Sequence, residues 1–189
     1  MPRLAGLLIA VLAVAAVGYI VASGSEEDRS GEPAVPAAGA AAAEVQATCT
    51  TGVPSSAQVS PKSVVLGQLV LIGARYAEAR RPDAFAGHGY KIPVSLPESG
   101  AATLSVARAA RGHVGLVFTL DTQDRVEARG VDGADRSVRF TACPDEAGNG
   151  GRTGWPGGFV VDHGRCATLL LTVAGRAAVR HRVPLGRRC

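Results

Sequence analysis

The sequence predicts an all-β protein, an antiparallel two-layer sandwich that follows one N-terminal transmembrane helix. Three observations lead to this fold class. A charge-free apolar stretch stands near the start of the 189-residue chain, and short runs of alternating apolar residues recur from residue 90 onward. Gly (24 residues) and Pro (11 residues) are frequent, which favours turns over long helices. Aromatic residues make up only 4% of the chain, so Val, Leu, Ile and Ala must fill the core.

The apolar stretch, Leu4 to Ser23, contains no charged residue. At a rise of about 1.5 Å per residue a helix over it spans roughly 30 Å, the hydrocarbon thickness of a bilayer. Arg3 precedes the stretch and the acidic residues 26–28 follow it. Because Lys and Arg stay on the cytoplasmic side, residues 1–3 are a cytoplasmic stub and residues 4–23 a single-pass span of the cell membrane. The C-terminal part is then extracytoplasmic.

A cleaved signal peptide is the alternative interpretation of this stretch. The apolar region of such a peptide usually has about 7–15 residues, fewer than here. Val21-Ala22-Ser23 matches the small residues of a cleavage site. The length favours a retained anchor, and both alternatives export the rest of the chain.

Residues 24–60 predict a flexible linker. They are rich in Gly, Ala, Pro, Ser and Glu and include the segment PAVPAAGAAAAEV. Such a composition buries too little apolar area to fold alone. The extracytoplasmic β-domain is therefore expected over residues 61–189.

Period-two alternation predicts half-buried strands in this domain. The alternating runs are 90–96, 102–107, 113–120, 137–142 and 178–185, and the continuous apolar runs 69–72, 159–161 and 169–171 predict further strands. Asp132-Gly133 predicts a hairpin turn between strands at 126–129 and 137–142. Only 74–81 looks helical, and Pro82 ends it. This pattern of short strands fits an immunoglobulin-like outline, with a small β-barrel as the alternative.

The four cysteines predict two disulfides, because an even number in an exported domain usually pairs. Cys166 opens one predicted strand and Cys189 follows the next, with a turn near Gly175 between them. Both cysteines then emerge at the open end of one hairpin, which favours a Cys166–Cys189 bridge. Cys49 is left for Cys143.

No catalytic, metal-binding or cofactor-binding motif occurs in the chain. The sequence contains no GxSxG, no GxxxxGK[ST] and no HExxH. Asp162 and His163 are adjacent, and in a strand their side chains would point to opposite faces, which argues against a direct pair. We therefore assign no catalytic residue, no metal ligand and no cofactor from the sequence.

Arg152 and Trp155 are the tentative ligand contacts. They lie in the segment RTGWPGGF, where the only Trp of the chain stands close to an arginine. Together they could form a stacking surface for a ligand such as a carbohydrate. The competing interpretation, which we favour, is that Trp155 covers one end of the core and that the glycines permit a tight turn.

The charge of the predicted domain is basic. From Ser60 onward 18 basic and 11 acidic residues occur, and no acidic residue follows Asp162. A basic face for an anionic polymer is one interpretation, and an ordinary charged exterior is the other. Nucleic acid is not an expected partner, because aromatic residues are too few for a base-stacking platform.

A resemblance to other proteins rests on four segments of the chain: the one around Phe140 and Cys143, Gly157 to Val161, Arg165-Cys166 and Arg188-Cys189. The arrangement resembles uncharacterised membrane-anchored β-proteins of high-GC, actinobacterial-type bacteria, and this resemblance implies no activity. From the residues we expect an extracytoplasmic binding or scaffold module, whose partner is an envelope protein or an anionic polymer. The alternatives are a cell-envelope enzyme with a site assembled in space and a structural subunit of a membrane complex.

Overall fold

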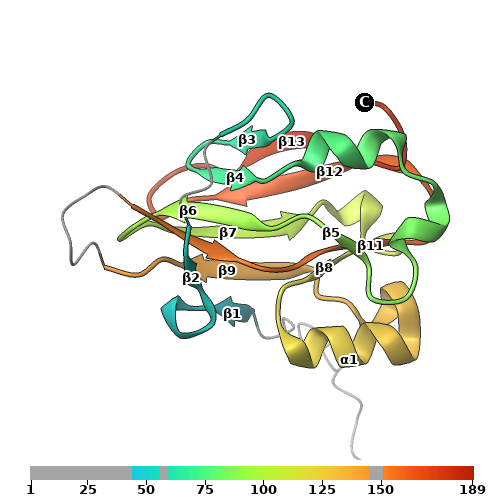
Figure 1. Ribbon diagram of the computed structural model, residues 1–189, viewed down its shortest axis with the longest axis horizontal. Coiled ribbons are helices and arrows are strands. Elements are labelled where there is room, and N and C mark those ends of the chain that lie inside the picture. Colours follow the sequence, from blue (N-terminus) through green and yellow to red (C-terminus); the bar gives the residue numbers. More distant parts are fainter. Residues whose placement is uncertain (1–43, 56–58, 145–150) are drawn as a thin grey trace, which may run out of the picture. The chain divides into compact units, whose positions relative to one another are not determined.

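The computed structural model describes residues 44–55, 59–144 and 151–189, which fall in one compact unit of the chain (Figure 1). The predicted transmembrane helix at 4–23 and the predicted linker as far as residue 43 lie outside the described residues. Within the described part of the chain, no helix is both long and apolar enough for a membrane crossing. Strands are the most frequent element among the described residues, and the prediction of a mostly β domain is confirmed.

Three sheets build the domain. The first has the order β1-β9-β7-β12-β13, with β1 parallel to β9 and the other neighbours antiparallel. The second has the order β2-β10-β6-β4-β3 and the third the order β5-β11-β8, both antiparallel. None of these sheets closes on itself within the described residues, so the alternative of a small β-barrel is wrong.

The strands of the first sheet are β1 (Val45–Ala47), β7 (Ala101–Val106), β9 (Ser137–Thr141), β12 (Arg165–Thr172) and β13 (Val179–Leu185). Those of the second are β2 (Val53–Pro54), β3 (Val64–Leu66), β4 (Leu69–Leu71), β6 (Val94–Pro97) and β10 (Arg152–Trp155), and those of the third are β5 (Tyr90–Lys91), β8 (Val114–Val117) and β11 (Gly158–Val161). The helix α1 covers Leu120–Arg129. Short 3-10 turns occupy Cys49–Thr51, Ala74–Ala79, Pro82–Phe85, Arg108–Ala110 and Gly130–Gly133.

One hydrophobic core joins the three sheets. Each contributes fully buried side chains to it, for example Leu104 and Leu169 from the first, Leu71 and Leu96 from the second and Leu116 from the third. In β7 the burial alternates strictly along the strand, as its period-two pattern predicts. Layered sheets around a single core are the arrangement expected for an all-β domain.

The chain joins the sheets earlier than the predicted boundary between residues 60 and 61. β1 pairs with β9, so that Ala47 lies opposite Phe140 and is fully buried. β2 pairs with β10. The sequence does not indicate these two strands, because the segment contains no recognisable apolar run. It contributes to the sheets mainly through backbone hydrogen bonds and small side chains.

Two predicted strands differ from the structure. The segment 126–129 is the end of helix α1, and Asp132-Gly133 lies in a 3-10 turn instead of a hairpin. The run 90–96 is split between β5 and β6, which belong to different sheets. The split follows from Pro93, which has no backbone N–H to continue the hydrogen-bond ladder. The predicted helix at 74–81 is present as the 3-10 segment Ala74–Ala79.

Both disulfides form as the hairpin argument favours. Cys166 is bonded to Cys189 at the open end of the β12–β13 hairpin. Cys49 is bonded to Cys143, so the chain before β2 is held covalently to the end of β9. No cysteine is free.

Candidate binding pocket

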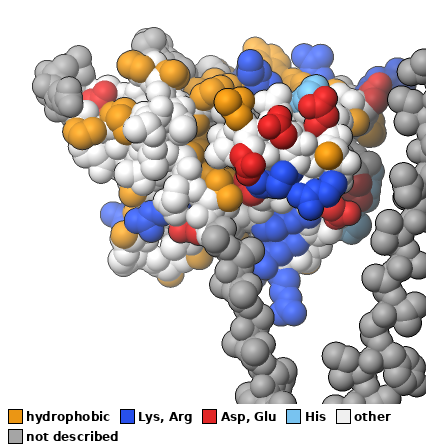
Figure 2. All heavy atoms as spheres, turned by 90° about the horizontal axis from the view of Figure 1, so that it is seen from below, with side chains coloured by type: hydrophobic (Ala, Val, Ile, Leu, Met, Phe, Trp, Pro, Cys, Tyr) orange, Lys and Arg blue, Asp and Glu red, His pale blue; other side chains and the backbone are white. Residues whose placement is uncertain are grey.

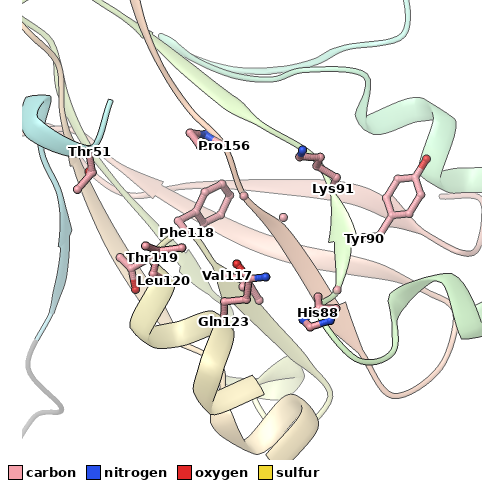
Figure 3. A pocket seen from close by; sticks show the side chains of 13 residues that line it. Thr51, His88, Tyr90, Lys91, Val117, Phe118, Thr119, Leu120, Gln123 and Pro156 are labelled. Atoms are coloured by element: carbon pink, nitrogen blue, oxygen red, sulfur yellow. The ribbon is translucent and has the colours of Figure 1, made fainter. Parts of the chain in front are cut away.

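A pocket of about 690 Å³ opens between the third sheet and the start of α1 (Figure 3). Ligand sites of proteins commonly have about 300–1,000 Å³. Its walls come from three places: the β5 edge with the preceding loop, the end of β8 with the first turn of α1, and the loop before β11. The residues that line it are Thr51, His88, Gly89, Tyr90, Lys91, Val117, Phe118, Thr119, Leu120, Gln123, Pro156, Gly157 and Gly158.

Two glycines leave one wall of the pocket as bare backbone. A Cβ atom on Gly158 would lie 2.0 Å from the Tyr90 carbonyl oxygen, and one on Gly157 would lie 2.3 Å from Cδ1 of Phe118. No heavy atom fits at such distances, so only glycine permits β11 to approach β5 and Phe118 this closely. The glycines that the sequence suggested for a tight turn therefore serve close packing beside the pocket.

Phe118 anchors the pocket to the core. Its ring is 5% exposed and packs edge-to-face on Phe140, with centroids 5.1 Å apart, and on Phe159, with centroids 6.0 Å apart. This geometry is the favoured one for aromatic pairs. The predicted strand over 113–120 is shorter in the structure, because β8 ends at Val117 and Leu120 begins the helix with 81% of its surface exposed.

The first turn of α1 is held in place by a cap and a buried carboxyl group. Thr119 accepts a hydrogen bond from the Thr122 backbone N–H at 3.1 Å, as an N-cap residue does. The Thr122 hydroxyl in turn donates a hydrogen bond to Asp135 Oδ2 at 2.5 Å, and the Arg125 guanidinium group donates one to Oδ1 at 2.5 Å. Burial raises the pKa of Asp135, and the bonds from Thr122 and Arg125 oppose that effect only in part.

Lys91 is the lining residue with a permanent positive charge, and no acidic residue lines the pocket. Figure 3 shows the Lys91 side chain directed from β5 toward Pro156, with His88 on the same side and Gln123 on the opposite wall. The Tyr90 ring points away from these groups and its hydroxyl accepts a hydrogen bond from Arg80 at 3.0 Å. Apolar walls with an ammonium group at one side suit a ligand that has an apolar body and an anionic group.

Arg152 and Trp155, the two tentative contacts, do not form a joint surface. They are three residues apart in β10, so their side chains lie on opposite faces of the strand. Trp155 is 1% exposed, and its indole N–H donates to the Thr48 carbonyl oxygen at 2.9 Å. Arg152 donates to Ser95 Oγ at 3.1 Å and to the Gln68 carbonyl at 3.0 Å, and its burial lowers the pKa of its guanidinium group. Arg152 thus connects strands of the second sheet, and Trp155 connects β10 to the chain just before Cys49.

A cluster of His113, Asp162 and His163 escaped the sequence analysis. β11 ends at Val161, so Asp162 and His163 lie in a bend and the opposite-face argument for a strand does not apply. Nδ1 of His163 is 2.7 Å from Asp162 Oδ1, and Nδ1 of His113 is 2.5 Å from Oδ2. Partial burial raises the pKa of Asp162, but the His113 hydrogen bond and the charges of Arg165 and the histidines outweigh it and lower that pKa.

The strand register explains why these residues meet. Val161 of β11 lies opposite Val114 of β8 in the antiparallel pair, so the residues just beyond them, Asp162 and His113, are neighbours. The Asp162 backbone N–H donates to the His113 carbonyl at 3.3 Å. The sequence does not reveal that β8 pairs with β11. Given that pairing, the positions of His113 and Asp162 at adjacent strand ends would have predicted that the two side chains meet.

The distribution of charge differs between two parts of the surface. On the side that carries α1, basic and acidic side chains lie next to one another (Figure 2), and Arg125 is paired there with Asp121 and Asp135. The five strands of the first sheet contain no acidic residue. Their register places the exposed Arg139, Arg180 and Arg182 on one face, together with Thr and Ser side chains.

Comparison with known proteins adds no further restriction on function, because the chain matches no family model, no curated protein and no solved structure.

Proposed function

We propose that the chain is a membrane-anchored extracytoplasmic binding module, and that its pocket binds a small molecule with an apolar body and an anionic group. The charge-free stretch at 4–23 supports the anchor. The two disulfides fit an oxidising compartment outside the cytoplasm. We include in this proposal that the β-domain has an immunoglobulin-like outline and that the chain is similar to membrane-anchored proteins of high-GC bacteria.

The observation that carries the proposal is the composition of the pocket wall. Val117, Phe118 and Pro156 offer apolar surface, while Lys91 supplies a positive charge that no acidic lining residue neutralises. An apolar cavity with a few polar groups that converge on it is the usual form of a small-molecule site. This arrangement favours recognition of a ligand over the alternatives of a spatially assembled enzyme site or a purely structural subunit.

A fluorescent dye of matching chemistry tests the pocket. Anilinonaphthalene sulfonate, which is apolar and anionic, is titrated against residues 41–189, the compact unit that contains every described residue. Lys91→Met is expected to weaken dye binding about fivefold, since loss of one partly solvated ionic contact costs about 1 kcal/mol. Lys62→Met is the matched control, because Lys62 lies over the Tyr76 ring outside the pocket. Equal effects of the two variants would contradict the proposal.

The acid-free face of the first sheet favours a second candidate function, contact with an anionic polymer of the cell envelope. Arg139, Arg180 and Arg182 would provide its charge. Binding of polyphosphate is the test, and it should weaken steeply with salt because exposed charges are screened within about 8 Å at physiological ionic strength. The triple Arg→Gln variant should lose this binding and retain binding of the dye.

The anchor has its own test. The mass of the protein purified from membranes is expected to correspond to a chain that retains residues 4–23. A mature chain that starts near Gly24 would show that a signal peptide is cleaved there and would refute the anchor without affecting the pocket.

A further inference from the structure

The cluster of His113, Asp162 and His163 lies apart from the pocket. Gly158 and Val117, which are paired, line the pocket, whereas Val161 and Val114 form the other end of the same β8–β11 ladder. Asp162 and His113 follow directly beyond that end. At about 3.3 Å per residue the two places are on the order of 10 Å apart along the strands. The cluster is therefore free to have a role that the pocket does not require.

Three side chains of the kinds that bind transition metals converge in the cluster. One donor atom from each of His113, Asp162 and His163 lies within 4.8 Å of the donor atoms of the other two. The two imidazole rings are 5.5 Å apart, at 66° to one another, on the two sides of the carboxyl group. Two imidazoles and one carboxylate are a common ligand set for zinc and for neighbouring divalent metals.

All three side chains can be reached from solvent and can adjust. The exposed fractions of the side chains are 48% for His113, 36% for Asp162 and 60% for His163. Oδ2 of Asp162 lies 2.5 Å from Nδ1 of His113, and Oδ1 lies 2.7 Å from Nδ1 of His163. A zinc ion about 2.0–2.2 Å from each donor atom would take the place of those two contacts after small side-chain rotations.

Arg165 bears directly on this cluster. Its Nη2 atom is 3.1 Å from Asp162 Oδ1 and also contacts the His163 ring. A guanidinium group so close to the ligand atoms repels a divalent cation and competes with it for the carboxylate. Arg165 therefore lowers the affinity of the cluster for a cation. Removal of Arg165 should raise this affinity, whereas removal of a ligand should lower it.

We propose that His113, Asp162 and His163 form a binding site for one divalent transition metal ion, with zinc as the representative ion, and that Arg165 weakens this site. Three protein ligands leave a fourth coordination position for water or for a donor atom from a partner. The site is thus of the open type rather than the closed, four-ligand structural type.

Isothermal titration of the full chain in detergent with zinc sulfate, after treatment with a chelator, tests the proposal. One zinc ion is expected to bind per chain. His113→Ala and His163→Ala should each lower the affinity at least about tenfold, because loss of one ligand leaves only two. His181→Gln is the matched control, since His181 lies on β13 away from the cluster, and it should leave zinc binding unchanged.

Arg165→Gln provides the second variant. Gln removes the positive charge, keeps a hydrogen-bond donor for Asp162, and should tighten zinc binding about tenfold, the scale of a charge–charge effect near a protein surface. Weaker binding in this variant would refute the assigned role of Arg165. Absence of zinc binding would overturn the site. Zinc binding that His113→Ala and His163→Ala leave unchanged would mean an adventitious ion only and would overturn it as well.

Nuclear magnetic resonance of the unaltered protein keeps the test valid where a variant fails to fold. Addition of zinc should shift the imidazole proton signals of His113 and His163 and leave those of His181 in place. Shifts at His181 alone would overturn the proposal.

Discussion

The indole N–H of Trp155 donates a hydrogen bond to the main-chain carbonyl oxygen of Thr48, 2.9 Å away. Trp155 lies in β10 and packs against Phe140 of β9, with ring centroids 5.2 Å apart. Thr48 immediately precedes Cys49, which is bonded to Cys143. One side chain and one disulfide thus hold the start of the domain on its core.

Replacement of Trp155 by Ala should lower the free energy of unfolding by about 3–5 kcal/mol, the usual cost of truncating a buried aromatic side chain. For a small domain the whole stability is only about 5–15 kcal/mol. Urea denaturation followed by circular dichroism should show a lower midpoint with an unchanged slope.

Two further variants test the reason for that loss. Trp155→Phe keeps an aromatic ring beside Phe140 but leaves the Thr48 carbonyl without its donor, so it should cost less than Trp155→Ala and more than a surface change. Tyr76→Ala removes an aromatic ring that is 56% exposed and should change stability by no more than about 0.5 kcal/mol. A Trp155→Ala protein as stable as Tyr76→Ala would contradict the structural role.

Removal of the Cys49–Cys143 bridge should destabilise the protein more than removal of the Cys166–Cys189 bridge. The sequence separations are 94 and 23 residues, and a longer closed loop restricts the unfolded chain more. Loop-closure entropy gives losses of about 4.7 and about 3.4 kcal/mol for the two double Cys→Ala variants. Chemical denaturation of both measures the difference, and the reverse order would show that contacts around the bridges dominate.

Gly158→Ala should destabilise the domain and deform the pocket. Its Cβ atom would collide with the Tyr90 carbonyl oxygen, so β5 and β11 could not keep their pairing. Gly112→Ala is the matched control, because a Cβ atom there meets no heavy atom within 4 Å and no left-handed backbone is involved. Thermal unfolding and dye binding should both change in Gly158→Ala alone. Normal dye binding by Gly158→Ala would place the ligand elsewhere.

Stability should depend on pH through Asp135. Burial raises the pKa of this carboxyl group in the folded protein, so the folded state takes up a proton at a higher pH than the unfolded chain, whose value is near 3.8. As the pH falls through the raised pKa toward that value, the folded state gains stability relative to the unfolded state.

Comparison with Asp135→Asn isolates this effect. Urea denaturation of both proteins from neutral to acid pH should show the difference in unfolding free energy moving in favour of the wild type as the pH falls. The other carboxyl groups titrate in both proteins and largely cancel in the difference. A difference that stays constant across the series would show that Asp135 titrates alike in the folded and unfolded states.

Part of the fold follows from local patterns. The alternation along β7, β9 and β13 predicts strands at those places, and they form within a residue or two of the predicted ends. The segment 126–129 shows the limit of that approach. Its few apolar residues fit a strand and a helix equally, and the cap at Thr119 together with the buried bonds to Asp135 selects the helix.

The sequence by itself determined several of the strands, among them β7, β9 and β13, that Val, Leu and Ala build the core, and which cysteines are suited to pair, because these depend on short-range periodicity and on hairpin geometry. Only the tertiary structure decided what the strands bring together. The pairing of β8 with β11 creates the pocket at one end and the His113–Asp162–His163 cluster at the other. These residues are up to 50 positions apart in the chain, as His113 and Asp162 are 49 apart. No local pattern encodes such a partner, because strand pairing depends on how the whole core packs.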